Sequence, residues 1–546
     1  MFNQGSMRRT YKHLCILWLL IFSYALLPAQ YFGRNKPFYR TFDFSLVETP
    51  HFQIYHYFDN PSQAEQLAAM SERWYRYHEQ VLLDTFKVRS PIIFYDNHAD
   101  FQQTTAIMGM IDVGVGGVTE GLKNRVVMPM GFTWQQTNHV LGHELVHAFQ
   151  FHMLMQTEGM GLSAMQNIPL WMIEGMAEYL SIGSIDAQTA IWMRDALMHN
   201  RFPTLEQMSS SYRYSPYRFG QAFWAYVSFR YGEQYIPRLF KATARRGYRN
   251  AIRDLFFVSA EEFSADWERT IRQHLFTNVN DSVYNIVGNR LVTKRNGGRY
   301  NLSPSVSPDG KYLIFLSERD VYGLDLFLAD ATSGDIIRKV FTSASHSDID
   351  ALNFMETAGT WSPDNRYFAF VAYSRGRSTI IIYDVNKLSV HKELAPNCVT
   401  AISYPAWSPD GRYLVFTGQK DLSSDLFLYD LQSGQCENLT NSQWAAIQPA
   451  WSADGRTIWF ATDEPSQWQK SRHGAFYNVA EYSVDSQQSR VHFTFDGARN
   501  LNPVPTPDGR SVVFLSNRDG RRNLYSMEIE TGFLIQITDY PTGITG

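Results

Sequence analysis

The stretch of this sequence best suited to chemistry is Gly142–Gln150, which reads GHELVHAFQ. His143 and His147 are four residues apart, so on a helix both imidazoles lie on one face and can reach one metal ion. Glu144 lies beside them, close enough to act on a water bound to that metal. The pattern supplies only two of the three protein ligands that a catalytic zinc ion needs. The alternative is a helix that carries its histidines by chance.

A second segment, PLWMIEGMAEY at residues 169–179, carries two carboxylates four residues apart. Glu174 and Glu178 therefore share one face of an expected helix that is otherwise apolar. Burying a carboxylate is costly unless it is paired or binds a metal. Glu174 as the third ligand removes that cost, and Glu178 can then accept a hydrogen bond from the second ring nitrogen of a ligand histidine. The alternative is an exposed acidic edge with both side chains in water.

Together these two segments resemble the gluzincin zinc metallopeptidases, in which HExxH is followed by a glutamate on a later helix. WMIEGMAEY is similar to the WLxEGxAEY pattern of the peptidase MA-like branch, and residues 117–129 and 217–221 also look like that branch. The resemblance covers residues 45–275 and implies an α+β zincin-type metallopeptidase domain. It also implies one bound Zn²⁺ and assigns the roles. The metal ligands are His143, His147 and Glu174, the general base is Glu144, and the residue that fixes a ligand histidine is Glu178.

The chemistry of such a site is hydrolysis of a peptide bond. Zinc lowers the pKa of its water to about 7 and polarises the scissile carbonyl. Glu144 takes the proton from that water and returns it to the leaving amine. The tetrahedral oxyanion needs a further donor, and the spacing does not choose among three candidates. These are His199, Tyr214 and Tyr217. His139 and His152, which flank the motif, are interpreted as ordinary helix residues.

The surrounding sequence predicts the elements that position the motif. Strands are expected at 52–57 and 91–95, with a helix at 62–84 between them. Arg125–Pro129 is predicted to be an exposed strand, which could present an edge to an extended peptide or pair within the sheet. The helix with the two histidines follows almost at once.

After residue 300 the chain repeats itself. Ser307-Pro308-Asp309-Gly310 has the composition of a tight turn, in which proline sets φ, aspartate bonds its own backbone and glycine accepts positive φ. Each copy is followed by two short strands, as in KYLIFLS and DLFLAD after the first. Such a recurrence is typical of a β-propeller with one four-stranded blade per repeat, whereas a plain β-sandwich would not repeat its turn. The other copies begin at Ser362, Ser408, Ser452 and Thr506.

These repeats resemble the WD40-like propeller of the TolB family, which implies a six-bladed ring and a cell-envelope location. Five turn motifs are present, in residues 301–540. Arg290–Asn296 could supply a strand of a closing blade. Five blades, a degenerate sixth blade and a fragment of a longer chain all remain open. Cys398 and Cys436 could pair in an exported chain or remain separate thiols.

Composition and the N-terminus bound the function further. The formal net charge is −4 and no basic block appears, which argues against nucleic acid as a partner. The first residues have a basic start, an apolar run at Leu14–Leu27 and a small residue for cleavage at Ala29, which is typical of a secretory signal. The run is shorter than the roughly 20 residues that span a bilayer. The sequence thus predicts an exported protein, periplasmic or in the outer envelope, with no transmembrane helix in the mature chain.

The expected organisation is therefore multidomain, an α+β zincin-type domain followed by an all-β propeller. The predicted function is an exported zinc metallopeptidase, an endopeptidase, whose propeller binds a protein partner or controls access. An aminopeptidase would need a further acidic site, for which there is no motif. The alternative function is a non-catalytic envelope scaffold, but Glu144, which ligates nothing, has no use there. The predicted boundaries are 1–29 signal peptide, 30–280 peptidase domain, 281–300 linker and 301–546 propeller.

Overall fold

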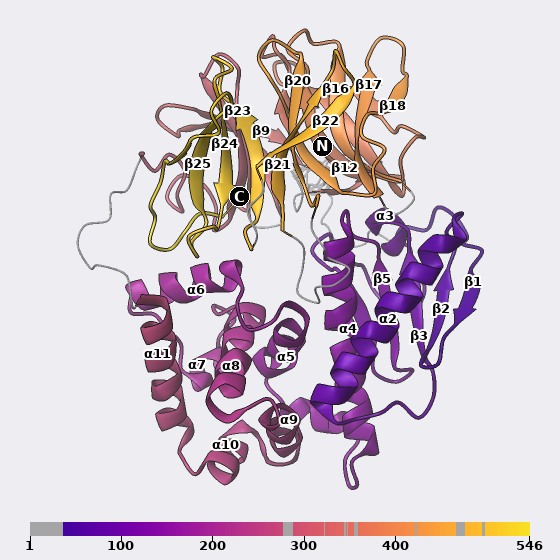
Figure 1. Ribbon diagram of the computed structural model, residues 1–546, viewed down its shortest axis with the longest axis vertical. Coiled ribbons are helices and arrows are strands. Elements are labelled where there is room, and N and C mark those ends of the chain that lie inside the picture. Colours follow the sequence, from indigo (N-terminus) through magenta and orange to yellow (C-terminus); the bar gives the residue numbers. More distant parts are fainter. Residues whose placement is uncertain are drawn as a thin grey trace, which may run out of the picture.

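The computed structural model describes residues 36–276, 288–320, 323–342, 346, 348–353, 359–420, 423–465, 476–493 and 497–545. The predicted signal peptide, at residues 1–29, lies outside the described residues. Figure 1 shows two parts, a mainly helical N-terminal region and a set of β-sheets above it. The chain is therefore multidomain, with a helical region followed by an all-β unit.

The N-terminal region contains one five-stranded sheet, in the order β1-β2-β3-β5-β4. β2 is parallel to β3 and β3 is parallel to β5, and the helix α2 (Pro61–Leu82) makes the crossover from β2 to β3. The strands and the helix predicted between residues 52 and 95 are thus confirmed. The strands are β1 (Ser45–Glu48), β2 (Phe52–His56), β3 (Ser90–Tyr95), β4 (Val118–Glu120) and β5 (Arg125–Pro129).

Arg125–Pro129 forms a strand as predicted, but the expectation that it is exposed is wrong, and of the two alternatives the strand pairs within the sheet. β5 lies between β3 and β4, and its Val126 and Val127 are completely buried. Two adjacent β-branched residues fit a strand that is covered on both faces. The edge strand is β4, which pairs antiparallel with β5. Any peptide that extended this side of the sheet would add to β4.

α3 lies between β3 and β4 and packs in a smaller apolar cluster, whereas the other helices given below follow the sheet and pack around one large apolar core. The helix with the two histidines is α4 and the helix with the two glutamates is α5. Their bounds are α3 (His98–Phe101), α4 (Trp134–Gln156), η1 (Leu162–Asn167), α5 (Leu170–Ile182), α6 (Ala187–Met198), α7 (Leu205–Ser210), α8 (Pro216–Tyr231), α9 (Tyr235–Arg246), α10 (Tyr248–Phe256) and α11 (Ala260–Phe276).

Two glycines allow α5 and α8 to cross in backbone contact. A Cβ at Gly175 would lie 2.2 Å from the carbonyl carbon of Gly220, and a Cβ at Gly220 would lie 2.1 Å from the carbonyl oxygen of Trp171. Real Cβ atoms do not approach backbone so closely, so only glycine fits at either position. This crossing fixes Glu174 and Glu178, on α5, relative to the first turns of α8.

The described part of the C-terminal region holds five antiparallel sheets, each beginning shortly before one of the repeated turns. In the first turn Asp309 Oδ1 accepts from Ser307 Oγ at 2.7 Å and from the backbone N–H of Lys311 at 3.2 Å, and Gly310 has a φ of 71°. The turn chemistry predicted from the sequence is therefore present. The five sheets are β6 (Asn301–Val306) to β9 (Ile336–Phe341), β10 (Ile349–Leu352) to β14 (Ser389–Leu394), β15 (Ala401–Trp407) to β18 (Cys436–Asn438), β19 (Ala446–Trp451) to β22 (Gln488–Phe493) and β23 (Asn500–Pro505) to β26 (Leu534–Gln536).

Arg290–Asn296 does not form the closing strand considered above. The segment is irregular, and Asn296 Nδ2 donates to the carbonyl oxygens of Leu291 and Gly334 at 2.7 and 2.8 Å. Its Val292 packs on the apolar face of the first blade. The segment thus covers this face without strand pairing. In the third blade, Cys398 and Cys436 form a disulfide.

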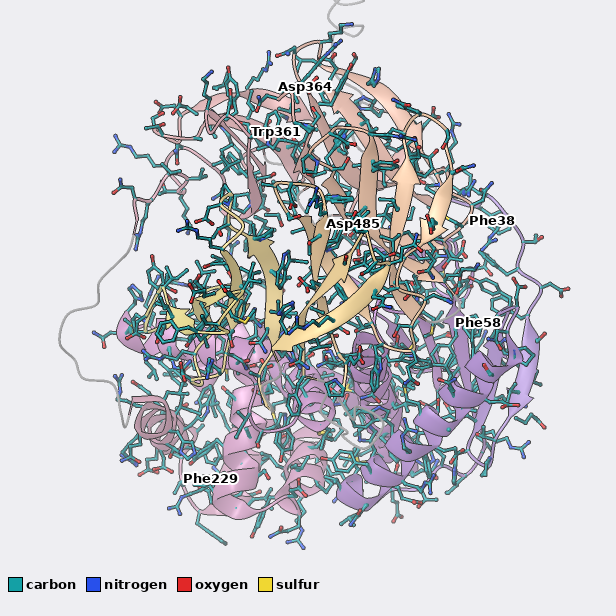
Figure 2. All side chains as sticks on the ribbon, turned by 45° about the horizontal axis from the view of Figure 1, so that its top comes forward. Phe38, Phe58, Phe229, Trp361, Asp364 and Asp485 are labelled. Atoms are coloured by element: carbon teal, nitrogen blue, oxygen red, sulfur yellow. A yellow bond between two sulfur atoms is a disulfide. The ribbon has the colours of Figure 1, made fainter. Side chains whose placement is uncertain are left out.

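The propeller docks on the N-terminal region through the loops between the second and third strands of its blades. Because strands alternate in direction, these loops lie at the end opposite to the repeated turns. In Figure 2 Asp364, in the second of those turns, lies in the propeller and Phe229 of α8 lies at the other end of the molecule. Docking contacts include Gln419 Nε2 donating to Gly131 O at 3.0 Å and Arg194 Nη2 donating to Gly520 O at 3.2 Å.

No helix within the described residues is both long enough and apolar enough to cross a membrane.

Candidate metal centre and active site

The helix α4 is built to hold its histidines in a fixed place. Thr133 caps it and forms a capping box with Gln136, which satisfies two free backbone N–H groups at the start of the helix. Further along, Gly142 lets α4 pack against α2, since a Cβ there would lie 2.6 Å from the indole ring of Trp74. His143 and His147 consequently emerge on the face that meets α5.

Three side chains converge with the geometry of a tetrahedral metal site. His143 Nε2 lies 3.2 Å from His147 Nε2 and 3.3 Å from Glu174 Oε2, and His147 Nε2 lies 3.4 Å from the same oxygen. In a tetrahedron with bonds of about 2.0–2.1 Å, typical of zinc, neighbouring ligand atoms are about 3.3–3.4 Å apart. The donor set and its spacing therefore fit one zinc ion, with the fourth position left for water or substrate.

The second nitrogen of each candidate ligand histidine also has a partner. His143 Nδ1 lies 3.3 Å from Glu178 Oε1, and His147 Nδ1 lies 2.9 Å from Gln150 Oε1. Gln150 is itself held by its Nε2, which donates to the carbonyl oxygen of Ile173 at 2.9 Å. Such contacts fix the ring orientation and leave Nε2 free to bind a metal. Glu178 thus lies beside the ring of His143, and the role predicted for it stays a prediction.

His139 is not the ordinary helix residue that the sequence suggested. Its Nε2 lies 3.3 Å from Glu178 Oε1, and Arg218 Nη1 lies 3.3 Å from the other oxygen, Oε2. Glu178 is thus surrounded by three basic side chains, which compensates for burying a carboxylate. His152, by contrast, pairs with Asp84 at 2.6 Å, away from the metal ligands.

The negative charges of Glu174 and Glu178 create a strongly negative electrostatic potential at this site. Burial alone would raise the pKa of Glu174, but hydrogen bonds with His143 and His147 hold it well below its usual value. Burial alone would lower the pKa of His143, but Glu174 and Glu178 raise it to about 10. The same field would stabilise a divalent cation at this point.

Glu144 is held beside the three converging side chains by β4. Thr119 Oγ1 lies 2.7 Å from Glu144 Oε2 and donates to its carboxylate. Gly117, just before β4, leaves room for that carboxylate, because a Cβ there would lie 2.9 Å from Oε1. Glu144 is only 5% exposed and points at the edge of the sheet. The candidate base and the edge strand β4 therefore lie side by side.

The structure separates the three candidates for the oxyanion donor. Tyr217, at the start of α8, stacks over His143 with ring centroids 6.0 Å apart and lies close enough to Glu174 for that carboxylate to affect its pKa. Burial, followed by the charges of the neighbouring glutamates, raises the pKa of its hydroxyl above the usual value, so it remains a donor. Tyr214 packs against Phe219, and His199 is half exposed and bonded to Asp195. Tyr217 alone of the three contacts the metal ligands.

Replacing Glu178 with glutamine is expected to weaken zinc binding by about 10–100-fold, because the partner of His143 loses its charge. The measurement is competition for zinc with a chelating dye. Glu65→Gln, at an exposed position on α2, is the matched control and should bind zinc like the unmodified protein. Equal affinity in both variants would mean that α4 alone orients His143.

Three residues of this site were not found by sequence reasoning. Thr119 and Gln150 lie inside segments quoted above but were given no role, and His139 was interpreted as an ordinary helix residue. For Gln150 and His139 a signal existed, since each lies three or four residues from a candidate ligand along α4 and so on a related face. Thr119 had no such signal, because its contact with Glu144 depends on how β4 docks against α4.

Comparison with known proteins agrees with this layout. A family model described as TolB beta propeller domain matches residues 353–542. The C-terminal region is a TolB-like β-propeller. A second family, described as peptidase of plants and bacteria, matches residues 124–263. That range runs from β5 to α11 and contains the three converging side chains, Glu144 and Tyr217.

Solved structures similar to this chain include TolB from Acinetobacter baumannii, at 22% identity and a TM-score of 0.35. The match covers 45% of this chain and 55% of that one, so this chain spans little more than half the length of that relative. A putative TolB from Agrobacterium tumefaciens also matches at 22% identity and a TM-score of 0.35, covering 44% of this chain and 80% of that chain. A search of curated proteins finds no match.

Proposed function

We propose that this protein is an exported zinc-dependent endopeptidase whose TolB-like propeller controls access to the active site. The observation that carries the proposal is the triangle of His143, His147 and Glu174 ligand atoms, with edges of 3.2–3.4 Å, beside a buried glutamate that ligates nothing. The match of residues 124–263 to a peptidase family supports it. Export is proposed from the basic and apolar N-terminal run.

In the proposed mechanism each residue has one task. A bound zinc ion would supply an acidified water and a Lewis acid for the scissile carbonyl. Glu144, held by Thr119, accepts a proton from the attacking water and delivers it to the leaving nitrogen. Tyr217 donates from its hydroxyl to the oxyanion. An extended substrate pairs with β4, which places its backbone beside Glu144.

The proposal that the propeller controls access is supported by its docking on the loop that precedes α4. Gln419 and Ser424 donate to the carbonyl oxygens of Gly131 and Phe132, and Tyr477 OH donates to Thr133 Oγ1 at 3.1 Å. A folded protein substrate would meet the propeller before it reached the metal ligands. Unfolded or extended chains are therefore the proposed substrates.

The test is zinc content and peptide cleavage of the mature full-length chain. We expect one zinc ion per molecule and cleavage of a mixed digest of unfolded protein, lost on treatment with a chelator and restored by zinc. Zinc without cleavage would favour the scaffold function. The absence of both bound zinc and cleavage would refute the proposal.

Tyr217→Phe should lower kcat by about 10²–10³-fold with little change in KM, because the hydroxyl is needed in the transition state more than in the ground state. Steady-state kinetics on one cleaved peptide measures both constants. Tyr214→Phe is the control, since Tyr214 packs beside Phe219 away from the metal ligands. A normal kcat for Tyr217→Phe would mean that a group other than the Tyr217 hydroxyl stabilises the oxyanion.

A further inference from the structure

A cluster of arginines lies where the fifth blade of the propeller meets α6 and α8. Figure 1 shows α6 directly below this blade. Burial lowers the pKa of Arg522, and the charges of Arg499 and Arg218 lower it further while Asp186 opposes them. Burial, and then the charge of Arg521, lowers the pKa of Arg194. The arginine cluster comprises Arg194, Arg218, Arg499, Arg521 and Arg522.

Two members of the cluster have buried N–H groups without a partner among the described residues. Arg194 is only 7% exposed, and its Nε and Nη1 have no hydrogen-bond partner in the part of the chain that the structure describes. Its Nη2 donates to Gly520 O. Arg522 Nε is likewise buried and unpaired. Leaving buried charged donors unsatisfied is costly, so these groups point to a ligand that completes them.

The carboxylates around the cluster do not balance it. Within the described residues, Arg218 pairs with Glu178 at 3.3 Å and with Asp186 at 3.6 Å, and Arg521 pairs with Asp539 at 2.8 Å. Arg194, Arg499 and Arg522 make no ion pair in the same part of the chain. Burial and then Arg521 lower the pKa of Arg194 to about 10, as expected for a cation among cations. An anion would relieve this repulsion.

The cluster is one contact away from the candidate metal centre. Arg218 touches Glu178, whose other oxygen contacts the ring of His143. An anionic group held by the cluster would therefore belong to a molecule that can also reach the metal ligands. Guanidinium groups suit carboxylates, which they bind through two parallel hydrogen bonds.

We propose that the arginine cluster binds a carboxylate of the peptide substrate and so selects peptides by an anionic group at a fixed distance from the scissile bond. The carboxylate can be the C-terminus of the peptide or an acidic side chain. This rests on the proposed peptidase function for the identity of the ligand. The propeller then contributes directly to the substrate site through Arg499, Arg521 and Arg522.

The test measures binding rather than cleavage, in full-length protein carrying Glu144→Gln and loaded with zinc. The probes are random-sequence hexapeptides with an N-terminal rhodamine label, in three forms. One has a free C-terminal carboxylate, one a C-terminal amide, and one a C-terminal amide with a glutamate fixed at one internal position. Fluorescence anisotropy gives the apparent Kd of each pool. Binding is repeated with Arg522→Gln and Arg499→Gln, and with Arg510→Gln as an exposed control on the same blade.

We expect the free carboxylate to bind about 10-fold or more tightly than the amide, as for hydrogen bonds to a charged group. Arg522→Gln and Arg499→Gln should abolish that difference, whereas Arg510→Gln should retain it. Recovery of affinity with the internal glutamate identifies a side chain as the recognised group. Equal binding of all three pools, no binding of any pool, or a preference that survives in both cluster variants would overturn the proposal. A preference without cleavage by the protein with Glu144 would leave the carboxylate site standing and remove the peptidase function.

Discussion

Glu144→Gln is expected to lower kcat by about 10²–10⁴-fold while zinc remains bound. Glutamine keeps the size and the hydrogen bond from Thr119 but cannot accept a proton from the attacking water. It also leaves the three candidate metal ligands unchanged, so the loss separates acid–base chemistry from metal binding. Cleavage of a single peptide and zinc content by mass spectrometry are measured on the same sample.

The control for this variant is Glu158→Gln, at an exposed position just after α4. It removes one negative charge near the same helix and should retain full activity. Undiminished cleavage by Glu144→Gln would exclude Glu144 as the base. A loss of zinc from this variant would instead show that Glu144 helps to hold the metal.

Gly175→Ala is expected to destabilise the N-terminal region by about 2 kcal/mol or more. Overpacking typically costs about 1–3 kcal/mol. Here the added methyl would lie 2.2 Å from the carbonyl carbon of Gly220, and a backbone atom cannot rotate away as a side chain can. The gain in helix propensity of about 1 kcal/mol offsets only part of this cost. Because α5 must move away from α8, zinc affinity should fall as well.

Calorimetry of the full chain, with and without zinc, measures the unfolding temperature of this region. Gly114→Ala is the matched control, since no atom lies within 4 Å of its added Cβ and its φ is not positive. Gly220→Ala should behave like Gly175→Ala. Normal thermal unfolding of both helix variants would contradict the close crossing.

The parts of the site that the sequence predicted are those set by local geometry. His143 and His147 share a face because they are four residues apart on a helix, and the same holds for Glu174 and Glu178. The repeated turns likewise carry their own signal, because each makes its hydrogen bonds within a few residues.

What the sequence did not predict depends on contacts between distant segments. The position of β5 inside the sheet follows from pairing with both β3 and β4, which the composition of one strand does not specify. Arg290–Asn296 has the composition of a strand but pairs with no strand among the described residues. It covers the first blade as an irregular segment. The docking of Gln419 on Gly131 joins residues 288 positions apart, for which one sequence carries no local signal.

The docking of the propeller on the start of α4 also bears on the order in which the protein matures. Synthesis proceeds from the N-terminus, so the histidine helix is made long before the third and fourth blades. The carbonyl oxygens of Gly131 and Phe132 and the hydroxyl of Thr133 gain Gln419, Ser424 and Tyr477 as partners only when those blades have folded. A nascent or truncated chain would lack these restraints on α4, so full organisation of the metal ligands would coincide with completion of the propeller.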